Sequence, residues 1–420
     1  MQEEAIETAA SYTNILLLSP TGTGKTLAYL IVLLDQLRAS EREVQALIVA
    51  PSRELSLQIE QVFKAMKTSY KVSCCYGGHD IKIEQNSLAE APAVIIGTPG
   101  RLADHIDRES FDASTIRVVV LDEFDKSLQM GFHEQLKVIF KALGGKQHHF
   151  LTSATPMQIL PDFFPVSKLK TLNYLLDEAD VSKLQLKVVP TKSADKVETL
   201  MRLVAGFNQE VCLVFCNHRE AVDRISALFK NHQFEHGTLH GAMEQIDREK
   251  SLIKFRGGAH NVLIATDLAS RGLDIPEIKH VVHYQLPVQQ DAFIHRNGRT
   301  ARMHAEGEAY LILADDESLP YYIESPPAVK IDLSKPLQLP PPPKYACLYI
   351  SAGKKDKINK GDIAGLLMKK GGLQGDDLGL ITTLDHASYV SVKRSLVDKV
   401  LVNIKDERLK KTRVKIEIAN

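Results

Sequence analysis

Residues 19–26, with the sequence SPTGTGKT, have the types and spacing that bind a polyphosphate. An apolar run precedes them and a helical pattern follows, so this loop joins a buried strand to a helix. Backbone N–H groups of such a loop point at a phosphate, at the positive end of the helix dipole. Lys25 would reach the outer phosphates, and the Thr26 hydroxyl would bind Mg²⁺. The full P-loop pattern has a glycine in place of Ser19, so the motif alone does not establish nucleotide hydrolysis.

An acidic run over residues 122–125 (DEFD) follows the apolar residues 118–121. Hydrolysis of a nucleoside triphosphate needs a carboxylate for the metal and a group that positions the attacking water. Asp122 is the candidate magnesium ligand, and Glu123 is the candidate base that orients the water. An acidic cluster after a strand is by itself more often a solvated strand end, but the loop at Lys25 favours the catalytic interpretation.

A basic run over residues 295–302 (HRNGRTAR) lies far along the chain from Lys25. Arginines supplied across a cleft neutralise the charge of a transferring phosphoryl group only when the cleft closes. Hydrolysis would then be coupled to a conformational step. In isolation, this run would be interpreted as a solvated basic helix face.

Apolar runs alternate with helical stretches in two successive parts of the chain, residues 1–175 and residues 181–333. Continuous apolar strands separated by helices predict a parallel sheet that is buried on both faces. Two tandem α/β domains are therefore predicted, and ligands usually bind in the cleft between such domains. The expected strands are residues 15–18, 46–50, 93–97, 118–121 and 149–152, then residues 212–216, 262–265 and 280–284.

The last part of the chain is a separate basic module. Residues 334–343 end in four consecutive prolines, which favour an extended spacer over a packed element. Residues 344–420 have the β-α-β-β-α-β order of a small α+β RNA-recognition module. They carry 16 Lys and Arg against 9 Asp and Glu, whereas the preceding residues carry 36 against 43. A basic module on an acidic body indicates an anionic partner.

Composition argues against several other classes. The chain has 44% hydrophobic and 25% charged residues, and no apolar run approaches the ~18 residues of a membrane span. No signal peptide is recognisable. Five scattered cysteines without zinc spacing fit a reducing cytoplasm. We therefore expect a cytoplasmic protein with no membrane partner.

The ordered set of motifs resembles that of DEAD-box RNA helicases over nearly the whole chain. This family has no glycine at the position of Ser19. The resemblance implies two RecA-like parallel-sheet domains followed by a small RRM-like domain, with ATP and Mg²⁺ as cofactors and RNA as partner. The motifs are PTGTGKT (20–26), PSREL (51–55), GG (77–78), TPGR (98–101), DEFD (122–125) and SAT (153–155), then VFCN (214–217), HG (240–241) with Gln245 and Arg248, ATD (265–267), RGLD (271–274) and HRNGRTAR (295–302).

The resemblance also implies roles for individual residues. The ATP-binding residues are Gln2, Thr21, Gly22, Thr23, Gly24, Lys25, Thr26 and Asp274, with Thr26 and Asp122 at the metal. The catalytic residues are Lys25, Asp122, Glu123 and two arginine fingers, Arg299 and Arg302. The residues that couple the nucleotide site to domain closure are Asp125, Ser153, Thr155 and His295. The residues that contact the RNA backbone are Arg53, Gly78, Thr98, Arg101, Arg248 and Thr266.

The tail resembles the C-terminal domain of the DbpA subgroup of bacterial DEAD-box proteins, through residues 350–361, GGLQG (371–375) and YVSV (389–392). In that subgroup the domain recognises a hairpin of large-subunit ribosomal RNA, which implies pre-ribosomal particles as partners. From the residues alone, Lys354 and Lys355 could bind phosphates and Tyr389 could stack on a base. A lone tyrosine on a strand is more often a core residue.

The sequence departs from the family pattern in two places. Phe124 replaces the alanine of D-E-A-D at a position that holds neither metal nor base, so we expect altered packing and retained hydrolysis. Gln2 stands at the spacing of the adenine-reading glutamine, and the preceding segment with the aromatic residue that stacks on adenine is absent. A late start codon or a truncation would explain this, and a truncation would weaken ATP selectivity.

The expected function is ATP-dependent RNA unwinding by a monomer, coupled to domain closure and directed to large-subunit ribosomal RNA during ribosome assembly. One alternative is a DNA translocase of the same superfamily. Another is an ATP-gated RNA clamp with little turnover.

Overall fold

The computed structural model describes residues 1–20, 23–144, 147–156, 160–165, 169–175, 184–267, 278–300, 307–324, 326–410 and 412–419. It divides the chain into two compact units, the first ending and the second beginning near residue 184. Four residues with predicted site roles, Thr21, Gly22, Asp274 and Arg302, lie outside the described residues.

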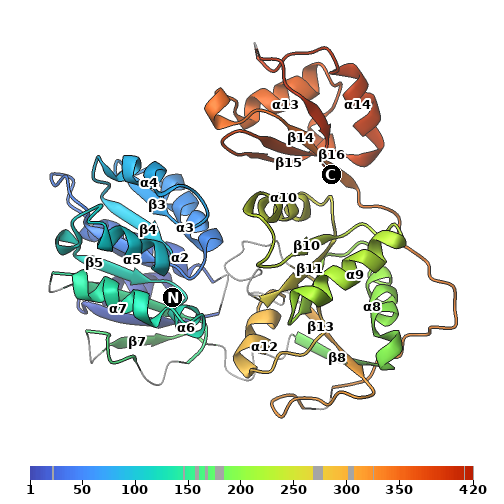
Figure 1. Ribbon diagram of the computed structural model, residues 1–420, viewed down its shortest axis with the longest axis horizontal. Helices are drawn as coiled ribbons and strands as arrows, with labels where there is room; N and C mark the ends of the chain where they lie inside the picture. Colours follow the sequence, from blue (N-terminus) through green and yellow to red (C-terminus); the bar gives the residue numbers. More distant parts are fainter. Residues whose placement is uncertain are drawn as a thin grey trace. The chain divides into compact units, whose positions relative to one another are not determined.

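The first unit contains a seven-stranded sheet in the order β3-β4-β2-β5-β6-β1-β7 (Figure 1). All of its strand pairs are parallel. Its strands are β1 (Asn14–Leu18), β2 (Ala46–Val49), β3 (Val72–Cys75), β4 (Val94–Gly97), β5 (Val118–Leu121), β6 (His148–Ser153) and β7 (Lys170–Asn173). Its helices are α1 (Gln2–Ala9), α2 (Lys25–Gln36), α3 (Arg53–Ala65), α4 (Ile81–Leu88), α5 (Pro99–Asp107), α6 (Phe124–Gln129) and α7 (His133–Ala142).

Alternate residues of the strands face two separate hydrophobic clusters, so both faces of this sheet are covered. Ile15 and Leu17 of β1 belong to one cluster, with apolar residues of α1, α2 and α3. Leu16 and Leu18 belong to the other cluster, with residues of α5 and α7. Strands β2, β4 and β5 are entirely buried. This packing explains why these strands read as continuous apolar runs.

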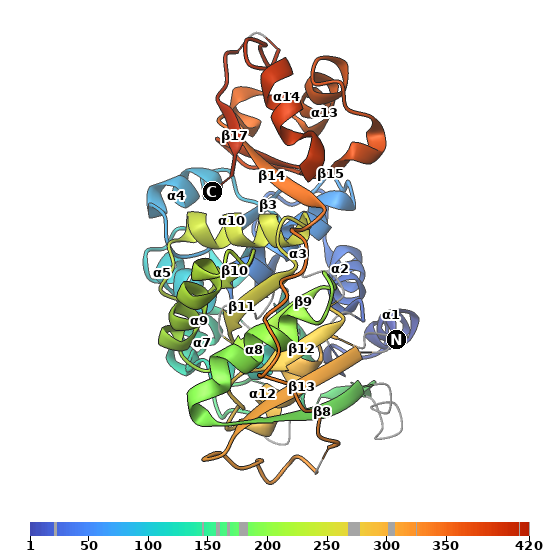
Figure 2. The same ribbon diagram turned by 90° about the vertical axis from the view of Figure 1, so that its right-hand side faces the viewer.

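The second unit contains a six-stranded parallel sheet in the order β10-β11-β9-β12-β13-β8 (Figure 2). The predicted fold of two tandem parallel-sheet domains is therefore confirmed. The strands are β8 (Leu184–Thr191), β9 (Cys212–Cys216), β10 (Gly237–Leu239), β11 (Val262–Thr266), β12 (His280–His283) and β13 (Gly307–Ala314). The helices are α8 (Lys196–Ala205), α9 (Arg219–Asn231), α10 (Gln245–Arg256) and α12 (Gln290–Asn297).

The same unit ends in a small domain with an antiparallel sheet in the order β15-β16-β14-β17. Its strands are β14 (Tyr345–Ile350), β15 (Leu378–Thr383), β16 (Ser388–Lys393) and β17 (Ile416–Ile418), with helices α13 (Lys360–Lys369) and α14 (Val397–Asn403). The two helices and one face of the sheet share a core. The predicted β-α-β-β-α-β order is confirmed.

The Pro-rich segment, predicted as an extended spacer, contains no helix or strand and makes a few contacts within the second unit. Leu337 packs against the core of the six-stranded sheet. Gln209 Nε2 donates to the carbonyl oxygen of Pro341 at 3.1 Å, and Arg394 Nε donates to that of Pro343 at 2.8 Å. Proline has no N–H but keeps its carbonyl, so this segment can accept hydrogen bonds along its length.

No helix within the described part of the chain is both long enough and apolar enough to cross a membrane.

Candidate active site and RNA-binding residues

The predicted site residues of the first unit follow the carboxyl ends of its strands. Because the strands are parallel, these ends meet at one edge of the sheet, where open α/β sheets bind ligands. The residues at this edge are Lys25 after β1, Arg53 after β2, Gly78 after β3, Thr98 after β4, Asp122 after β5, and Ser153 at the end of β6.

Side chains at the two ends of the predicted phosphate loop contact each other and the loop backbone. Lys25, the first residue of α2, is 7% exposed, and its Nζ donates to the Ser19 carbonyl oxygen at 2.6 Å. The Ser19 and Thr23 hydroxyl oxygens are 2.7 Å apart. Gly24 caps α2 at φ +90°, a conformation that favours glycine. Gln2 Nε2 is 3.4 Å from the Gly24 carbonyl oxygen, so the predicted adenine-reading residue lies beside the loop.

Asp122 is buried and held in one orientation. Its Oδ2 accepts a hydrogen bond from the Tyr29 hydroxyl at 2.9 Å, and its Oδ1 accepts one from the Thr152 hydroxyl at 2.6 Å. Burial, reinforced by the Asp122 carboxylate, holds the pKa of Tyr29 well above its usual value, so its hydroxyl remains a donor. Tyr29 also interacts with the Thr26 hydroxyl. Thr26 and Asp122 therefore offer Mg²⁺ the hard oxygen ligands that it prefers.

Glu123 has an unusual backbone conformation for a residue with a side chain. Its φ of +46° lies in the left-handed region, which costs about 1–2 kcal/mol for a residue other than glycine. Such strain concentrates at functional sites. The Glu123 N–H donates to Thr152 Oγ1 at 3.0 Å, on the side chain that also fixes Asp122. The neighbouring Phe124 is fully buried against Phe164, so its aromatic ring is part of the hydrophobic core.

Three of the four residues predicted to couple the nucleotide site to domain closure contact one another. Thr155 Oγ1 donates to Asp125 Oδ2 at 2.8 Å. Ser153 Oγ donates to the Thr155 carbonyl oxygen at 2.6 Å and accepts from the Thr155 N–H at 3.1 Å. All three residues are buried, and these hydrogen bonds join α6 to the segment that follows β6.

Three residues predicted to bind RNA in the first unit also lie together. The Arg53 guanidinium lies 4.9 Å from the centre of the Tyr76 ring. Gly78 has φ +99°, a backbone conformation that favours glycine, and the Arg53 guanidinium lies where a Cβ would be. Arg101 NH2 donates to the His79 carbonyl oxygen at 2.9 Å. Thr98 caps α5 nearby in sequence.

The second unit contains a buried arginine, Arg296, whose role was not predicted from the motifs. Arg296 is 1% exposed and forms two hydrogen bonds to Asp267, Nε to Oδ1 at 2.6 Å and NH2 to Oδ2 at 2.7 Å. It also donates to Asn217 Oδ1 at 2.7 Å and to the Gln285 carbonyl oxygen at 2.6 Å. The sequence signal that marks Arg296 is its position within the basic run over residues 295–302. In the structure its side chain joins the ends of β9, β11 and β12.

The other predicted residues of the second unit are distributed around this arginine and on α10. Arg299 is 5% exposed, and Thr266 ends β11. His295 is half-buried on α12, and Arg248 is half-buried on α10.

Buried His283 makes the stability of the second unit sensitive to pH. Its Nε2 lies 2.9 Å from Asn297 Oδ1, and burial, aided by the Arg296 charge, lowers its pKa to about 3. Between pH 6.5 and 3 the unfolded chain binds a proton at this position that the folded chain excludes. The contribution of His283 to stability is thus fully present above pH 6.5 and is lost as the pH falls towards 3.

We expect acidification from pH 7.5 to 5.0 to remove about 2 kcal/mol through His283 alone. Urea unfolding of wild type and His283→Gln at the two pH values measures this contribution. The variant should lose less stability over the interval. An equal loss in both proteins would show that His283 does not contribute.

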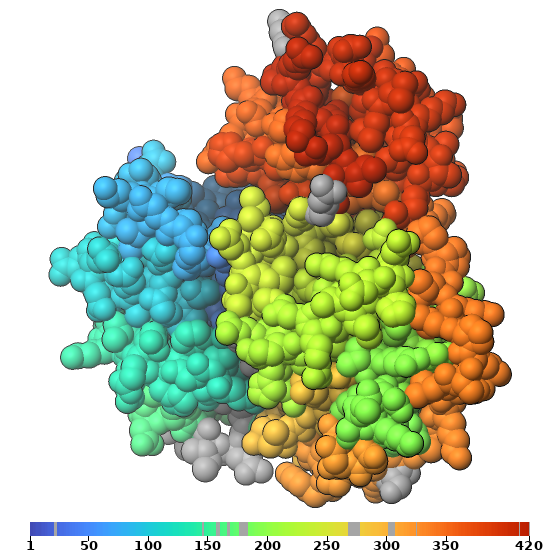
Figure 3. Space-filling view, turned by 45° about the vertical axis from the view of Figure 1, so that its right-hand side comes forward, coloured from blue at the N-terminus to red at the C-terminus, as the bar shows by residue number. Residues whose placement is uncertain are grey.

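The C-terminal domain does not present Tyr389 for base stacking. Tyr389 is 4% exposed and shares a hydrophobic cluster with Ile253 of α10, Ala259 and Cys347. The prediction that Tyr389 binds RNA conflicts with this packing, because the ring has no open face. Figure 3 shows this domain seated on the preceding part of its unit. Lys354 and Lys355 remain exposed, so they are available to phosphates.

Together, the fold and the site define a P-loop enzyme with a helicase-type core: two parallel-sheet domains, one with a lysine at the phosphate loop and an acidic pair at its edge. Known families match along the chain. DEAD/DEAH box helicase matches residues 1–163, helicase conserved C-terminal domain residues 195–304, and DbpA RNA binding domain residues 347–418.

Two curated relatives match this chain over nearly its whole length. ATP-dependent RNA helicase DbpA of Bacillus subtilis is 30% identical, with 100% of this chain and 94% of that protein covered. The Escherichia coli protein of the same name is 30% identical, with 98% and 92% covered. A solved structure of Saccharomyces cerevisiae Dbp5 bound to RNA and ADP BeF3 aligns with a TM-score of 0.67 and 28% identity, covering 75% of this chain and 83% of that one. The chain belongs to the DEAD-box family of ATP-dependent RNA helicases, and to its DbpA type.

Proposed function

We propose that this helicase uses ATP and Mg²⁺ to open short duplexes in large-subunit ribosomal RNA, acting on pre-ribosomal particles in the cytoplasm. Lys25 would bind the phosphates, Thr26 and Asp122 would hold the metal, and Glu123 would orient the attacking water. Arg299 and Arg302 would supply positive charge to the transferring phosphoryl group. Backbone contacts by the core would be independent of sequence, so the C-terminal domain would choose the RNA.

The observation that carries this proposal is the basic RRM-like domain that follows the helicase core in this chain. It carries an excess of 7 positive charges, from 16 Lys and Arg against 9 Asp and Glu. The face of its sheet that contains Tyr349 and Tyr389 packs against residues near α10. RNA recognition would therefore use loops and helices outside this covered face, beginning with the exposed lysines at residues 354 and 355.

A charge reversal on the C-terminal domain tests the proposal. In the full chain, Lys354→Glu with Lys355→Glu should lower the apparent affinity for the preferred ribosomal fragment about tenfold and reduce the salt slope by about 2. ATP turnover stimulated by an unrelated RNA should stay within about twofold. The readout is ATPase activity across a panel of large-subunit fragments and scrambled RNA.

The matched control is Lys399→Glu on α14, which changes an exposed lysine elsewhere on the same domain. It should keep the fragment preference. If the double variant also keeps that preference, the exposed lysines at 354 and 355 do not select the RNA. If wild type shows no preference for any fragment, the ribosomal assignment is wrong.

A further inference from the structure

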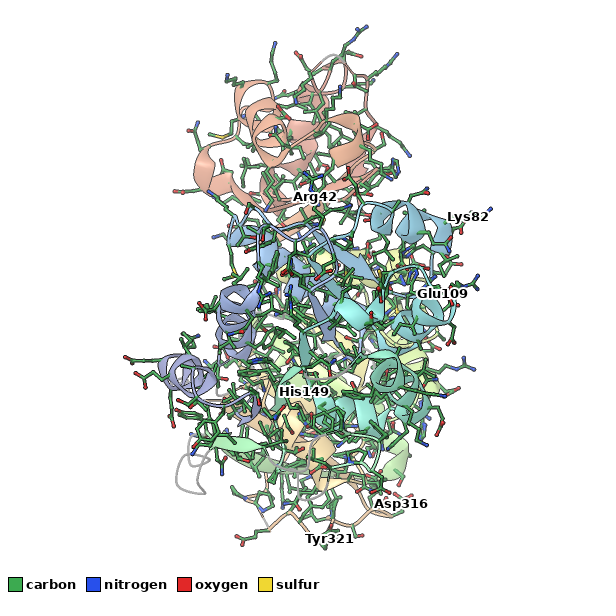
Figure 4. The ribbon with its side chains drawn as sticks, turned by 90° about the vertical axis from the view of Figure 1, so that its left-hand side faces the viewer. Arg42, Lys82, Glu109, His149, Asp316 and Tyr321 are labelled. Atoms are coloured by element: carbon green, nitrogen blue, oxygen red, sulfur yellow. The ribbon has the colours of Figure 1, made fainter. Side chains whose placement is uncertain are left out.

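Glu84 is a buried carboxylate with no role in the assignments above. It lies on α4 and is 4% exposed, whereas Lys82 and Ile83 on the same helix are exposed. Figure 4 shows Lys82 pointing away from the domain. A buried charge is costly unless it is paired and hydrogen-bonded. The groups around Glu84 therefore indicate what it does.

Four groups from two segments meet at the Glu84 carboxylate. Oε1 accepts a hydrogen bond from the Tyr76 N–H at 2.8 Å and lies 2.8 Å from His79 Nε2. Oε2 lies 2.7 Å from His105 Nε2 and 3.5 Å from Arg101 Nε. His105 is fully buried, one turn after Arg101 on α5. Glu84 thus joins residues 76–79 to the first turns of α5.

These two segments contain residues to which we assign RNA contacts. Tyr76 and His79 flank the Gly77-Gly78 pair, and their rings pack edge to face with centres 4.7 Å apart. Arg101 binds both the Glu84 carboxylate and the His79 carbonyl oxygen. Arg53 lies on the Tyr76 ring. Each of these contacts involves a residue that binds the Glu84 carboxylate directly.

We propose that Glu84 is a positioning residue for RNA binding, whose carboxylate fixes Arg101 and the 76–79 segment in their binding arrangement. This inference rests on the proposed RNA contacts of Arg53, Gly78 and Arg101. Glu84 acts from behind the surface, since its side chain is buried and occupied by protein donors. Pre-organised donors bind phosphate more tightly because less freedom is lost on binding.

The same place has a second possible chemistry. Ligand atoms of Cys75, Glu84 and His105 lie within 4.8 Å of one another, a spacing that a metal ion could use. Burial, however, raises the pKa of Cys75 and so favours the thiol over the thiolate that binds metal. The carboxylate oxygens of Glu84 also already face four donor groups. The observations favour a hydrogen-bonded hub, in which the Glu84 carboxylate joins the groups named above, over a metal centre.

Glu84→Gln in the full chain tests the role. The amide keeps the volume but loses the charge opposite Arg101 and one acceptor oxygen. We expect the RNA concentration for half-maximal ATPase stimulation to rise about tenfold. Turnover at saturating RNA and the KM for ATP should stay within about twofold, because the nucleotide site is unchanged. The control is Glu90→Gln, the same change at a side chain that is 94% exposed, which should behave as wild type.

A double-mutant cycle with Arg101→Gln separates positioning from general destabilisation. If Glu84 acts in part through Arg101, the loss of RNA affinity in the double variant should be smaller than the sum of the two single losses. Additive losses, or unchanged RNA affinity in Glu84→Gln, would overturn the inference. If Arg101→Gln itself leaves RNA affinity unchanged, the proposed RNA contact fails instead.

Two further measurements complete the test. If circular dichroism shows that Glu84→Gln does not fold, Glu84→Asp is used in its place. The shorter side chain keeps the charge but moves the carboxylate away from its hydrogen-bond partners. Elemental analysis of the purified wild-type chain should find no stoichiometric zinc. One zinc per chain that Glu84→Gln loses would establish a metal centre and overturn the hub.

Discussion

Glu123→Gln should lower RNA-stimulated ATP turnover by about 10²–10³, with ATP and RNA affinities within about threefold of wild type. The amide has nearly the shape of the carboxylate but cannot take a proton from the attacking water. The Glu123 N–H bond to Thr152 and the hydrogen bonds to Asp122 involve other atoms and should persist. The loss should therefore fall on turnover and leave binding intact. Steady-state ATPase kinetics with RNA in excess measure both quantities.

The matched control is Glu134→Gln, the same change in the first turn of α7, where the side chain is 78% exposed. It should turn over ATP at the wild-type rate. Equal, negligible hydrolysis by wild type and Glu123→Gln would instead support the ATP-gated clamp. Wild-type turnover in Glu123→Gln would remove this residue from the catalytic role.

Arg296→Met should cost the second unit about 3–5 kcal/mol of unfolding free energy. The variant removes at once the hydrogen bonds that Arg296, at a buried position, donates to Asp267, Asn217 and the Gln285 carbonyl. Arg296→Lys should recover little of this loss, because an ammonium group cannot reproduce the planar fork. Urea unfolding, monitored at the transition of the second unit, measures the difference in unfolding free energy between the variants and wild type.

Arg219→Met on α9 is the control for this prediction. Arg219 also has an acidic partner, Glu220, but its side chain is 61% exposed, so its loss should cost under about 0.5 kcal/mol. Equal losses in Arg296→Met and Arg219→Met would contradict a structural role for the buried network.

The sequence was sufficient to predict the central strands, because their residues are buried on both faces. Residues 118–121 and 212–216 are continuous apolar runs, and the structure has strands there. The edge strand β7 was not predicted: its sequence KTLN has one buried residue and no apolar run. Strand β3 contains Ser73 and two cysteines, so its pattern was also weak.

The sequence predicted those site residues that belong to a recognisable motif. It did not predict residues whose role depends on contacts made only in the fold. Lys25 and Asp122 stand in recognisable motifs, and the structure places each at the carboxyl end of a strand. Glu84 lies in an unremarkable helical segment, and only the fold brings residues 76 and 105 to it. The prediction for Tyr389 was wrong for the same reason. Whether a strand tyrosine can stack on a base depends on what covers the sheet, and here the cover includes Ile253, which is far away in sequence.

The most direct test of the central claim is ATP turnover by the full chain with three nucleic acids of equal length: a large-subunit ribosomal hairpin fragment, a scrambled RNA and the DNA version of the hairpin. We expect strong stimulation by the preferred hairpin at low concentration, weaker stimulation by scrambled RNA and none by DNA. Equal stimulation by RNA and DNA would contradict it.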